Sequence, residues 1–222
     1  MKKNPDCEKI FKLLEGKMPS KTFFNIGLGS DPSHDEALQF KFRFPNIVVY
    51  GVEANGDFVE IRKKDYPGKI FKVGIWSEKC RKTLTVPKIS VDRASLLEAK
   101  EEWAVSRKFK TDRLIEVDCV TLDDIDTLVG FPESIYLWMD IEGAELEALK
   151  GAKKLLKSGR VNYISLEVSS VGLPGEQMPR RMNEPTILEI DDYLNKFGYV
   201  RKSIFSRATI WVNVLYVAKW LA

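Results

Sequence analysis

The chain has 222 residues, of which 44% are hydrophobic and 30% charged, and its 35 basic residues nearly balance its 32 acidic ones. This composition is typical of a globular protein with a hydrophobic core, and a typical domain size of roughly 150 residues favours a single domain over 1–222. The net charge of +3 excludes a nucleic-acid binder that depends on a large basic excess, unless the basic residues cluster. We therefore expect no nucleic-acid partner.

The three cysteines, Cys7, Cys80 and Cys119, are widely spaced and form no CxxC pair. We therefore expect neither a disulfide framework nor a zinc site. The cysteine usage also predicts a reducing, cytoplasmic location. No stretch approaches the roughly 18 apolar residues of a membrane-spanning helix, so no membrane span is predicted. The sequence leaves the oligomeric state open.

Strand-like and helix-like segments alternate along the chain, which predicts an α/β fold with a mostly parallel sheet and helices on both faces. Residues 1–20 are expected to form an N-terminal helical extension. Strands are expected at 22–27, 47–52, 69–73, 117–120, 135–139 and 163–168, and a C-terminal antiparallel hairpin at 199–220. Helices are expected at 33–44, with Ser33 and Glu36 in capping-box spacing, at 58–64, from the acids after residue 140 to Gly159, and at 185–198.

Two segments interrupt this alternation. Residues 78–112 are interpreted as an insertion or lid, with a short strand at 83–86 and an amphipathic helix at 92–108. Residues 169–183 form a loop rich in Gly, Pro and Arg, interpreted as a substrate loop. Its Arg180 and Arg181 have two explanations: they bind an acidic substrate, or they belong to a solvated loop, which is the simpler reading.

The first expected strand ends in Asn25-Ile26-Gly27-Leu28-Gly29-Ser30, and the second ends in Glu53. Glycines let the backbone approach a ligand closely, and an acid at the end of the second strand suits the ribose hydroxyls of a nucleotide. A tight turn followed by a surface glutamate is the alternative. A dinucleotide fingerprint requires a third glycine where Pro32 stands, so a cofactor without a pyrophosphate, such as S-adenosylmethionine (SAM), fits better than NAD(P).

Three acids, Asp140, Glu142 and Glu145, follow the strand expected at 135–139, at the edge of the sheet where open α/β folds bind ligands. Glu145 and Glu147 are explained by the preference of acids for a helix N-terminus. Asp140 differs from these two acids, because it interrupts an apolar strand at the carboxyl end of that strand. If SAM methylates a hydroxyl, a base must remove the proton of that hydroxyl, and Asp140 is then the candidate base, with Glu167, at the end of the next strand, as its helper.

Six blocks of the sequence together resemble the FkbM-type SAM-dependent methyltransferases, over about residues 22–198. They are Asn25-Ile26-Gly27, Val52-Glu53, Val120-Thr121-Leu122-Asp123, Asp140-Ile141-Glu142-Gly143-Ala144-Glu145, Leu149-Lys150-Gly151-Ala152 and Leu166-Glu167-Val168. The most specific part is the D-x-E-G-A-E…L-x-G-A block with the preceding T-L-D. The family's loop usually begins with an acid and continues Gly-Ala-Asn-x-Gly, so Asn25 and Leu28-Gly29-Ser30-Asp31 depart from it.

The resemblance implies a Rossmann-like class I methyltransferase fold, with a seven-stranded sheet whose last strand is antiparallel, and O-methylation of a small-molecule or sugar hydroxyl. Carried over by position, Asn25, Gly27 and Gly29 line the methionine part of SAM. Glu53 meets the ribose, and Gly74, Ile75 and Trp76 lie near the adenine. Asp31 is expected to compensate for the missing acid by meeting the SAM ammonium, and Asp140 to face the reaction centre.

Three alternatives stay open on the residues alone. Asp140, Glu142 and Glu167 offer the oxygen ligands that Mg²⁺ prefers, although a metal is the less favoured reading. An NAD(P)-dependent oxidoreductase or epimerase is a second, disfavoured by Pro32 and by the lack of a Tyr-x-x-x-Lys pair. A non-catalytic nucleoside-binding module is the third.

Overall fold

The computed structural model describes residues 3–14, 20–89, 91–106, 110–131, 133–170, 180–207 and 211–221. Its main element is a seven-stranded sheet in the order β3-β2-β1-β7-β8-β10-β9. β10 runs antiparallel to both of its neighbours, and β3, β2, β1, β7 and β8 are mutually parallel. The predicted α/β fold with a mostly parallel sheet and C-terminal antiparallel strands is therefore confirmed. The strands are β1 (Thr22–Ile26), β2 (Val48–Glu53), β3 (Lys69–Lys72), β7 (Ile135–Met139), β8 (Val161–Ser169), β9 (Tyr199–Arg207) and β10 (Trp211–Ala218).

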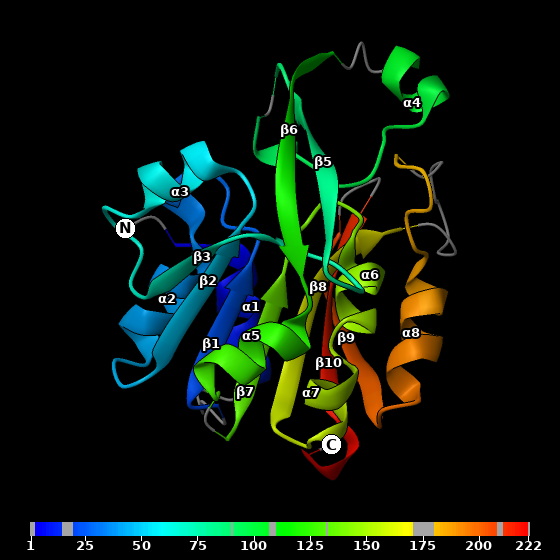
Figure 1. Cartoon of the computed structure of the whole chain (residues 1–222). Helices are drawn as coiled ribbons and strands as arrows, with labels where there is room; N and C mark the ends of the chain where they lie inside the picture. The colour runs from blue at the N-terminus through cyan, green and yellow to red at the C-terminus, as the bar shows by residue number, and fades with distance from the viewer. Residues whose placement is uncertain are drawn as a thin grey trace.

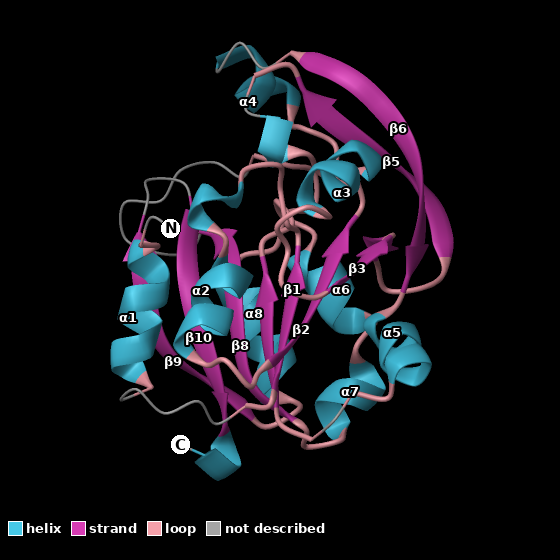
Figure 2. Cartoon of the chain, turned by 90° about the vertical axis from the view of Figure 1, so that its left-hand side faces the viewer, coloured by secondary structure: helices cyan, strands magenta, loops and turns pink. Residues whose placement is uncertain are grey.

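The central strands read as continuous apolar runs because helices cover both faces of the sheet. All five residues of β7 are buried. One face packs against the apolar sides of α5, α6, α7 and α8, and the other packs against α1 and α2. Figures 1 and 2 show the sheet between these two groups. The helices are α1 (Pro5–Leu13), α2 (Glu36–Arg43), α3 (Gly56–Arg62), α4 (Glu101–Ser106), α5 (Leu122–Val129), α6 (Glu145–Lys150), α7 (Lys153–Lys157) and α8 (Ile187–Asn195).

The segment interpreted as an insertion begins with one strand of a β-hairpin and ends where the other strand starts. β5 (Cys80–Pro87) and β6 (Thr111–Val120) pair antiparallel, and β6 joins β4 (Gly74–Ile75) in a second, three-stranded sheet. Figure 1 shows this hairpin rising above the main sheet, with α4 beside its far end. The strand expected at 117–120 is therefore only the last part of a longer strand.

The amphipathic helix expected at 92–108 was wrong over most of its length. The structure has a 3-10 turn, η2 (Val91–Arg93), and then α4, which starts only at Glu101. Between them the backbone is extended and bonds to distant segments: Ser95 exchanges two hydrogen bonds with Thr85, at 2.9 and 3.1 Å, and the Lys100 amide donates to the Arg180 carbonyl at 2.9 Å. Tertiary pairing thus satisfies the backbone groups that a helix would have paired locally.

Helix boundaries also differ from the prediction, by two or three residues at α3 and α8, and for physical reasons at two other helices. α2 starts at Glu36, because Asp35 is its N-cap and accepts the Leu38 amide at 2.7 Å. The helix expected to run to Gly159 breaks into α6 and α7. The Asp123 carboxylate accepts the amides of Lys154 and Leu155 at 2.9 and 2.8 Å and so caps α7. Asp123, from the T-L-D block, therefore has a structural role.

The remaining expectations concern the two ends of the chain and the long loop. α1 lies beside α2, and Asn4 at its N-cap donates to the Glu36 carboxylate at 2.9 Å. Most of the loop predicted at 169–183 lies outside the described residues. Within the part of the chain that the structure describes, no helix has the length and apolar character needed to cross a bilayer.

Candidate active site

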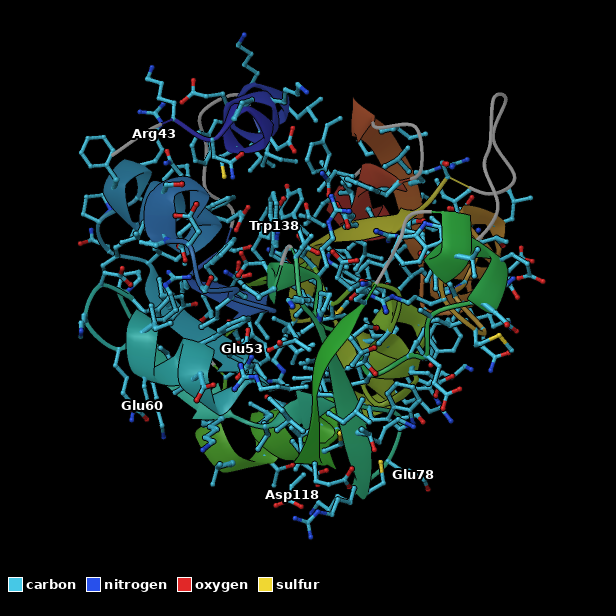
Figure 3. The ribbon with its side chains drawn as sticks, turned by 90° about the horizontal axis from the view of Figure 1, so that it is seen from above. Arg43, Glu53, Glu60, Glu78, Asp118 and Trp138 are labelled. Atoms are coloured by element: carbon cyan, nitrogen blue, oxygen red, sulfur yellow. The ribbon has the colours of Figure 1, made fainter. Side chains whose placement is uncertain are left out.

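The carboxyl ends of β1, β2, β7 and β8 open into a cavity of about 370 Å³. This is the position where open parallel sheets bind ligands, and the volume lies within the usual range for small-molecule sites. The hairpin side of the cavity is closed by Leu84 of β5 and by residues 92–94, and Trp211 at the start of β10 closes the side beyond β8. Figure 3 looks onto this end of the molecule and shows Glu53 toward its centre.

The glycine loop after β1 has a conformation that requires its glycines. Gly27 and Gly29 have φ angles of 85° and 60°, which side-chain-bearing residues rarely adopt. A Cβ on Gly27 would lie 1.9 Å from the backbone oxygen of Asp140. Gly27 therefore lets the loop after β1 lie directly against the loop after β7, and both loops line the cavity.

Glu53, at the end of β2, holds the glycine loop in place. Its Oε2 accepts the amides of Leu28 and Gly29 at 3.0 and 3.2 Å, and its Oε1 accepts the Asn55 amide at 2.7 Å. Burial raises the pKa of this carboxyl group, and the backbone hydrogen bonds oppose that rise. Glu53 both lines the cavity and fixes the loop, a second role that its position in the sequence did not reveal.

A buried arginine also holds the glycine loop in place. Arg62, on α3, donates to the Leu28 carbonyl at 2.8 Å and pairs with Asp35 and Asp65. The segment 58–64 was predicted only as a polar helix, so this fully buried side chain was missed. Its charge is neutralised by two carboxylates, as a buried guanidinium requires.

Three carboxyl groups meet near the carboxyl ends of β7 and β8. Oxygen atoms of Asp140, Glu142 and Glu167 all lie within 4.8 Å of one another. Burial, followed by the negative charge of Glu142, raises the pKa of Asp140 to about 7. Burial and the charge of Asp140 raise the pKa of Glu167 well above its usual value. Asp140 nevertheless faces open solvent in the cavity, so its carboxyl group can exchange protons.

Glu145, in the same motif, is explained by local structure. Its Oε1 accepts the amides of Ile141 and Gly143 at 3.1 and 3.3 Å, and the side chain is fully buried. Burial raises its pKa to about 8. It therefore fixes the loop that carries Asp140 and Glu142, consistent with the predicted structural reading of this acid.

Arg180 and Arg181 are buried, so the solvated-loop reading was wrong. Arg180 pairs with Glu142 at 3.0 Å and with Glu184 at 3.1 Å, and its guanidinium lies over the Trp211 ring, 4.9 Å from the centroid. Arg181 donates to the Arg93 carbonyl at 2.8 Å. The two arginines therefore tie the segment after the long loop to the loop after β7 and to the insertion.

Eight of the ten predicted site residues line the cavity: Gly27, Gly29, Asp31, Glu53, Gly74, Ile75, Asp140 and Glu167. Two do not. Asn25 is buried within β1, between Gly51 and Trp138 in the strand register. The Trp76 ring instead packs with the hairpin core and carries the Lys82 ammonium 3.8 Å from its centroid.

The structure adds lining residues that sequence reasoning did not assign to the site: Asp35, Glu36, Phe58, Leu84, Asp92, Arg93 and Trp211. Glu36 was read as a capping residue, yet it faces the cavity, and burial raises its pKa to about 8. The others come from segments with no ligand motif. Only their place in the folded chain brings them to the cavity.

The residues present suit SAM, whose sulfonium and ammonium groups are cationic. Among the residues that the structure describes, eight acidic side chains line the cavity: Asp31, Asp35, Glu36, Glu53, Asp92, Asp140, Glu142 and Glu167. A cationic ligand would offset the mutual repulsion of those that are ionised. The backbone at Gly27 and Gly29 leaves no Cβ between the loop and a ligand. Phe58, Ile75 and Leu84 supply an apolar wall beside Glu53.

Comparison with known proteins agrees with this assignment. The family model described as "Methyltransferase FkbM domain" matches residues 25–201. No curated protein matches the sequence.

Solved structures with similar folds include several methyltransferases. The pyocyanin biosynthetic protein PhzM is 11% identical, with a TM-score of 0.48, over 97% of this chain and 55% of that one. A SAM-dependent methyltransferase from Aquifex aeolicus is 14% identical, with a TM-score of 0.45, over 96% and 89% of the two chains. The N-terminal domain of human METTL16, in complex with SAH, is 13% identical, with a TM-score of 0.46, over 95% and 66%. The family match spans most of the sequence, and the chain therefore belongs to the FkbM methyltransferase family, with the predicted Rossmann-like α/β fold.

Proposed function

We propose that this enzyme transfers the methyl group of SAM to a hydroxyl of a small-molecule or carbohydrate acceptor, with Asp140 as general base and Glu167 as its helper. The observation that carries the proposal is the position of Asp140. It lies against the glycine loop at Gly27, lines the cavity, and has a carboxyl group with a pKa raised to about 7.

The cofactor-binding residues proposed are Gly27, Gly29, Asp31, Glu53, Gly74 and Ile75, all of which line the cavity. In this arrangement Glu53 retains unused lone-pair capacity on Oε1 for a ribose hydroxyl, because that oxygen accepts a single backbone amide. Asn25 and Trp76, also predicted from the family positions, do not line the cavity, so any effect of theirs on SAM would pass through the residues that do.

When bound, SAM supplies an electrophilic methyl group on a sulfonium, which a hydroxyl oxygen attacks in line. A neutral hydroxyl is a poor nucleophile, so a base must take its proton as the new bond forms. A carboxylate with a pKa near 7 accepts a proton more readily than one with the ordinary value near 4, and remains largely ionised above neutral pH. Desolvation of Asp140 and its repulsion by Glu142 thus make it a stronger base.

Glu167 would share the proton with Asp140. The two groups lie in one cluster, and the negative charge of Asp140 helps to raise the pKa of Glu167. A Mg²⁺ ion on Asp140, Glu142 and Glu167 remains the less favoured alternative, because Arg180 already neutralises part of the cluster through its 3.0 Å ion pair with Glu142.

The experiment is a methyl-transfer assay with radiolabelled SAM and a panel of neutral sugars, polyols and phenols, run beside calorimetric titration with S-adenosylhomocysteine (SAH). We expect SAH to bind, and label to appear on a hydroxyl of at least one acceptor. Asp140→Asn should bind SAH within a few-fold of the wild type and lose methyl transfer by about 10²-fold to 10⁴-fold. A wild type that does not bind SAH, or an Asp140→Asn variant with full activity, would refute the proposal.

A further inference from the structure

The short turn η2 brings part of the insertion to the cofactor loop. The Asp92 carboxylate accepts the Ser30 amide at 2.5 Å, and Asp92 Oδ1 would lie 3.1 Å from a Cβ on Gly29. The next residue, Arg93, is half-buried and lines the same cavity as Gly27, Gly29 and Asp140. The insertion therefore contributes side chains at the methionine end of the proposed cofactor site.

Arg93 is distinctive in its charge. Among the described residues that line the cavity, it is the one basic side chain, facing eight acidic side chains. The charges of SAM are complementary to those of the cavity: SAM has two cationic groups, the sulfonium and the ammonium, and a single carboxylate. An acidic cavity suits the sulfonium and ammonium, but the carboxylate needs a cation, and Arg93 is the cation that this wall provides.

The position of Arg93 is fixed while its guanidinium stays available. Its carbonyl accepts Arg181 at 2.8 Å, and its guanidinium lies over the Trp211 ring, 5.2 Å from the centroid. Over the described part of the chain, its side chain makes no ion pair within 4.0 Å. Arg180, on the same tryptophan, differs because Glu142 and Glu184 neutralise it.

We propose that Arg93 binds the α-carboxylate of the methionine moiety of SAM, so that the insertion completes the cofactor site. The planar guanidinium matches a carboxylate with two parallel hydrogen bonds, and stacking on Trp211 restrains it in advance. This proposal rests on the proposed cofactor site. It adds a binding residue from residues 78–112, the segment that the sequence predicted as an insertion or lid.

The test compares SAM with decarboxylated SAM, which keeps the sulfonium and the amino group and lacks only the carboxylate. Both ligands are titrated calorimetrically into the wild type, Arg93→Met and Arg93→Lys. Arg81→Met is the matched control, because Arg81 is a largely exposed arginine on β5 of the same insertion, outside the cavity. Thermal melting without ligand checks that each variant folds.

We expect the wild type to bind SAM about 10-fold to 100-fold more tightly than decarboxylated SAM, the loss expected for a charge-assisted hydrogen bond. Arg93→Met should lose this preference by weakening SAM binding alone, Arg93→Lys should keep part of it, and Arg81→Met should keep all of it. Equal wild-type affinity for the two ligands, or an equal loss for both in Arg93→Met, would overturn the proposal. A wild type that binds neither ligand would instead refute the cofactor site itself.

Discussion

Glu53 gives the sharpest test of how this cavity holds a nucleoside. Its carboxylate accepts three backbone amides, those of Leu28, Gly29 and Asn55. Glu53→Gln keeps the shape of the side chain but removes the charge and replaces one acceptor oxygen with an NH₂ group. That group cannot accept a hydrogen bond, so at least one backbone amide loses its partner.

The magnitude follows from counting those bonds. If the glutamine oxygen faces Leu28 and Gly29, the Asn55 amide is the one left unpaired, and an unsatisfied buried donor costs about 1–3 kcal/mol of unfolding free energy. Burial raises the pKa of Glu53, so removing the charge also removes a desolvation cost that offsets part of this loss. Ligand binding lacks that compensation. Losing a charged acceptor for the ribose should cost about 1.5–3 kcal/mol, or roughly 10-fold to 150-fold in Kd.

The assay is calorimetric titration with SAH, together with urea unfolding of the unliganded protein to separate loop stability from binding. Glu60→Gln is the control, because Glu60 lies on α3 at the edge of the molecule (Figure 3), with its side chain 65% exposed and paired with Lys63. We expect Glu60→Gln to leave the SAH affinity unchanged.

The reasoning would be refuted by a folded Glu53→Gln protein whose Kd for SAH stays within about twofold of the wild type, a difference of roughly 0.4 kcal/mol. Glu53 would then serve only to hold the glycine loop. A large fall in unfolding free energy with unchanged affinity would identify that purely structural role.

Three further predictions concern the same cavity. Gly27→Ala should weaken SAH binding at least tenfold, because its Cβ would lie 1.9 Å from the Asp140 oxygen. Gly130→Ala, at a φ of 61° with nothing within 4 Å of its Cβ, should lower the unfolding free energy by only the roughly 1–2 kcal/mol of left-handed strain. Equal effects of the two substitutions in titration and in melting would argue against the clash. Ionisation of Asp140, with a pKa of about 7 in the fold and about 4 unfolded, disfavours folding as the pH rises through that window. Asp140→Asn should therefore raise the Tm at pH 8 and lose this advantage near pH 4, and a pH-independent difference would contradict the assignment. Glu184→Gln should lower the unfolding free energy by about 1–3 kcal/mol, because Arg180 loses one of its two buried carboxylate partners and keeps Glu142. Urea unfolding measures this, and an unchanged unfolding free energy would contradict it.

The sequence by itself determined the central sheet and the motifs on it. The unbroken apolar run of β7 and the glycines after β1 are local signals, because strand burial and left-handed turns restrict the residues allowed at each position. Asp140 and Glu53 could be placed for the same reason: each directly follows or ends a strand whose carboxyl end must reach the cavity. The D-x-E-G-A-E block added the family.

Only the tertiary structure decided the rest of the cavity. Asp92 and Arg93 reach it because residues 95–100 pair with β5 and with the segment after the long loop instead of forming a helix. Arg180 is buried because Glu142 and Glu184 neutralise it. Such contacts join residues far apart in the chain, so no local periodicity encodes them. The cofactor edge could be read from the sequence because it is built from strand ends, while the insertion side depends on long-range pairing and on the balance of buried charge.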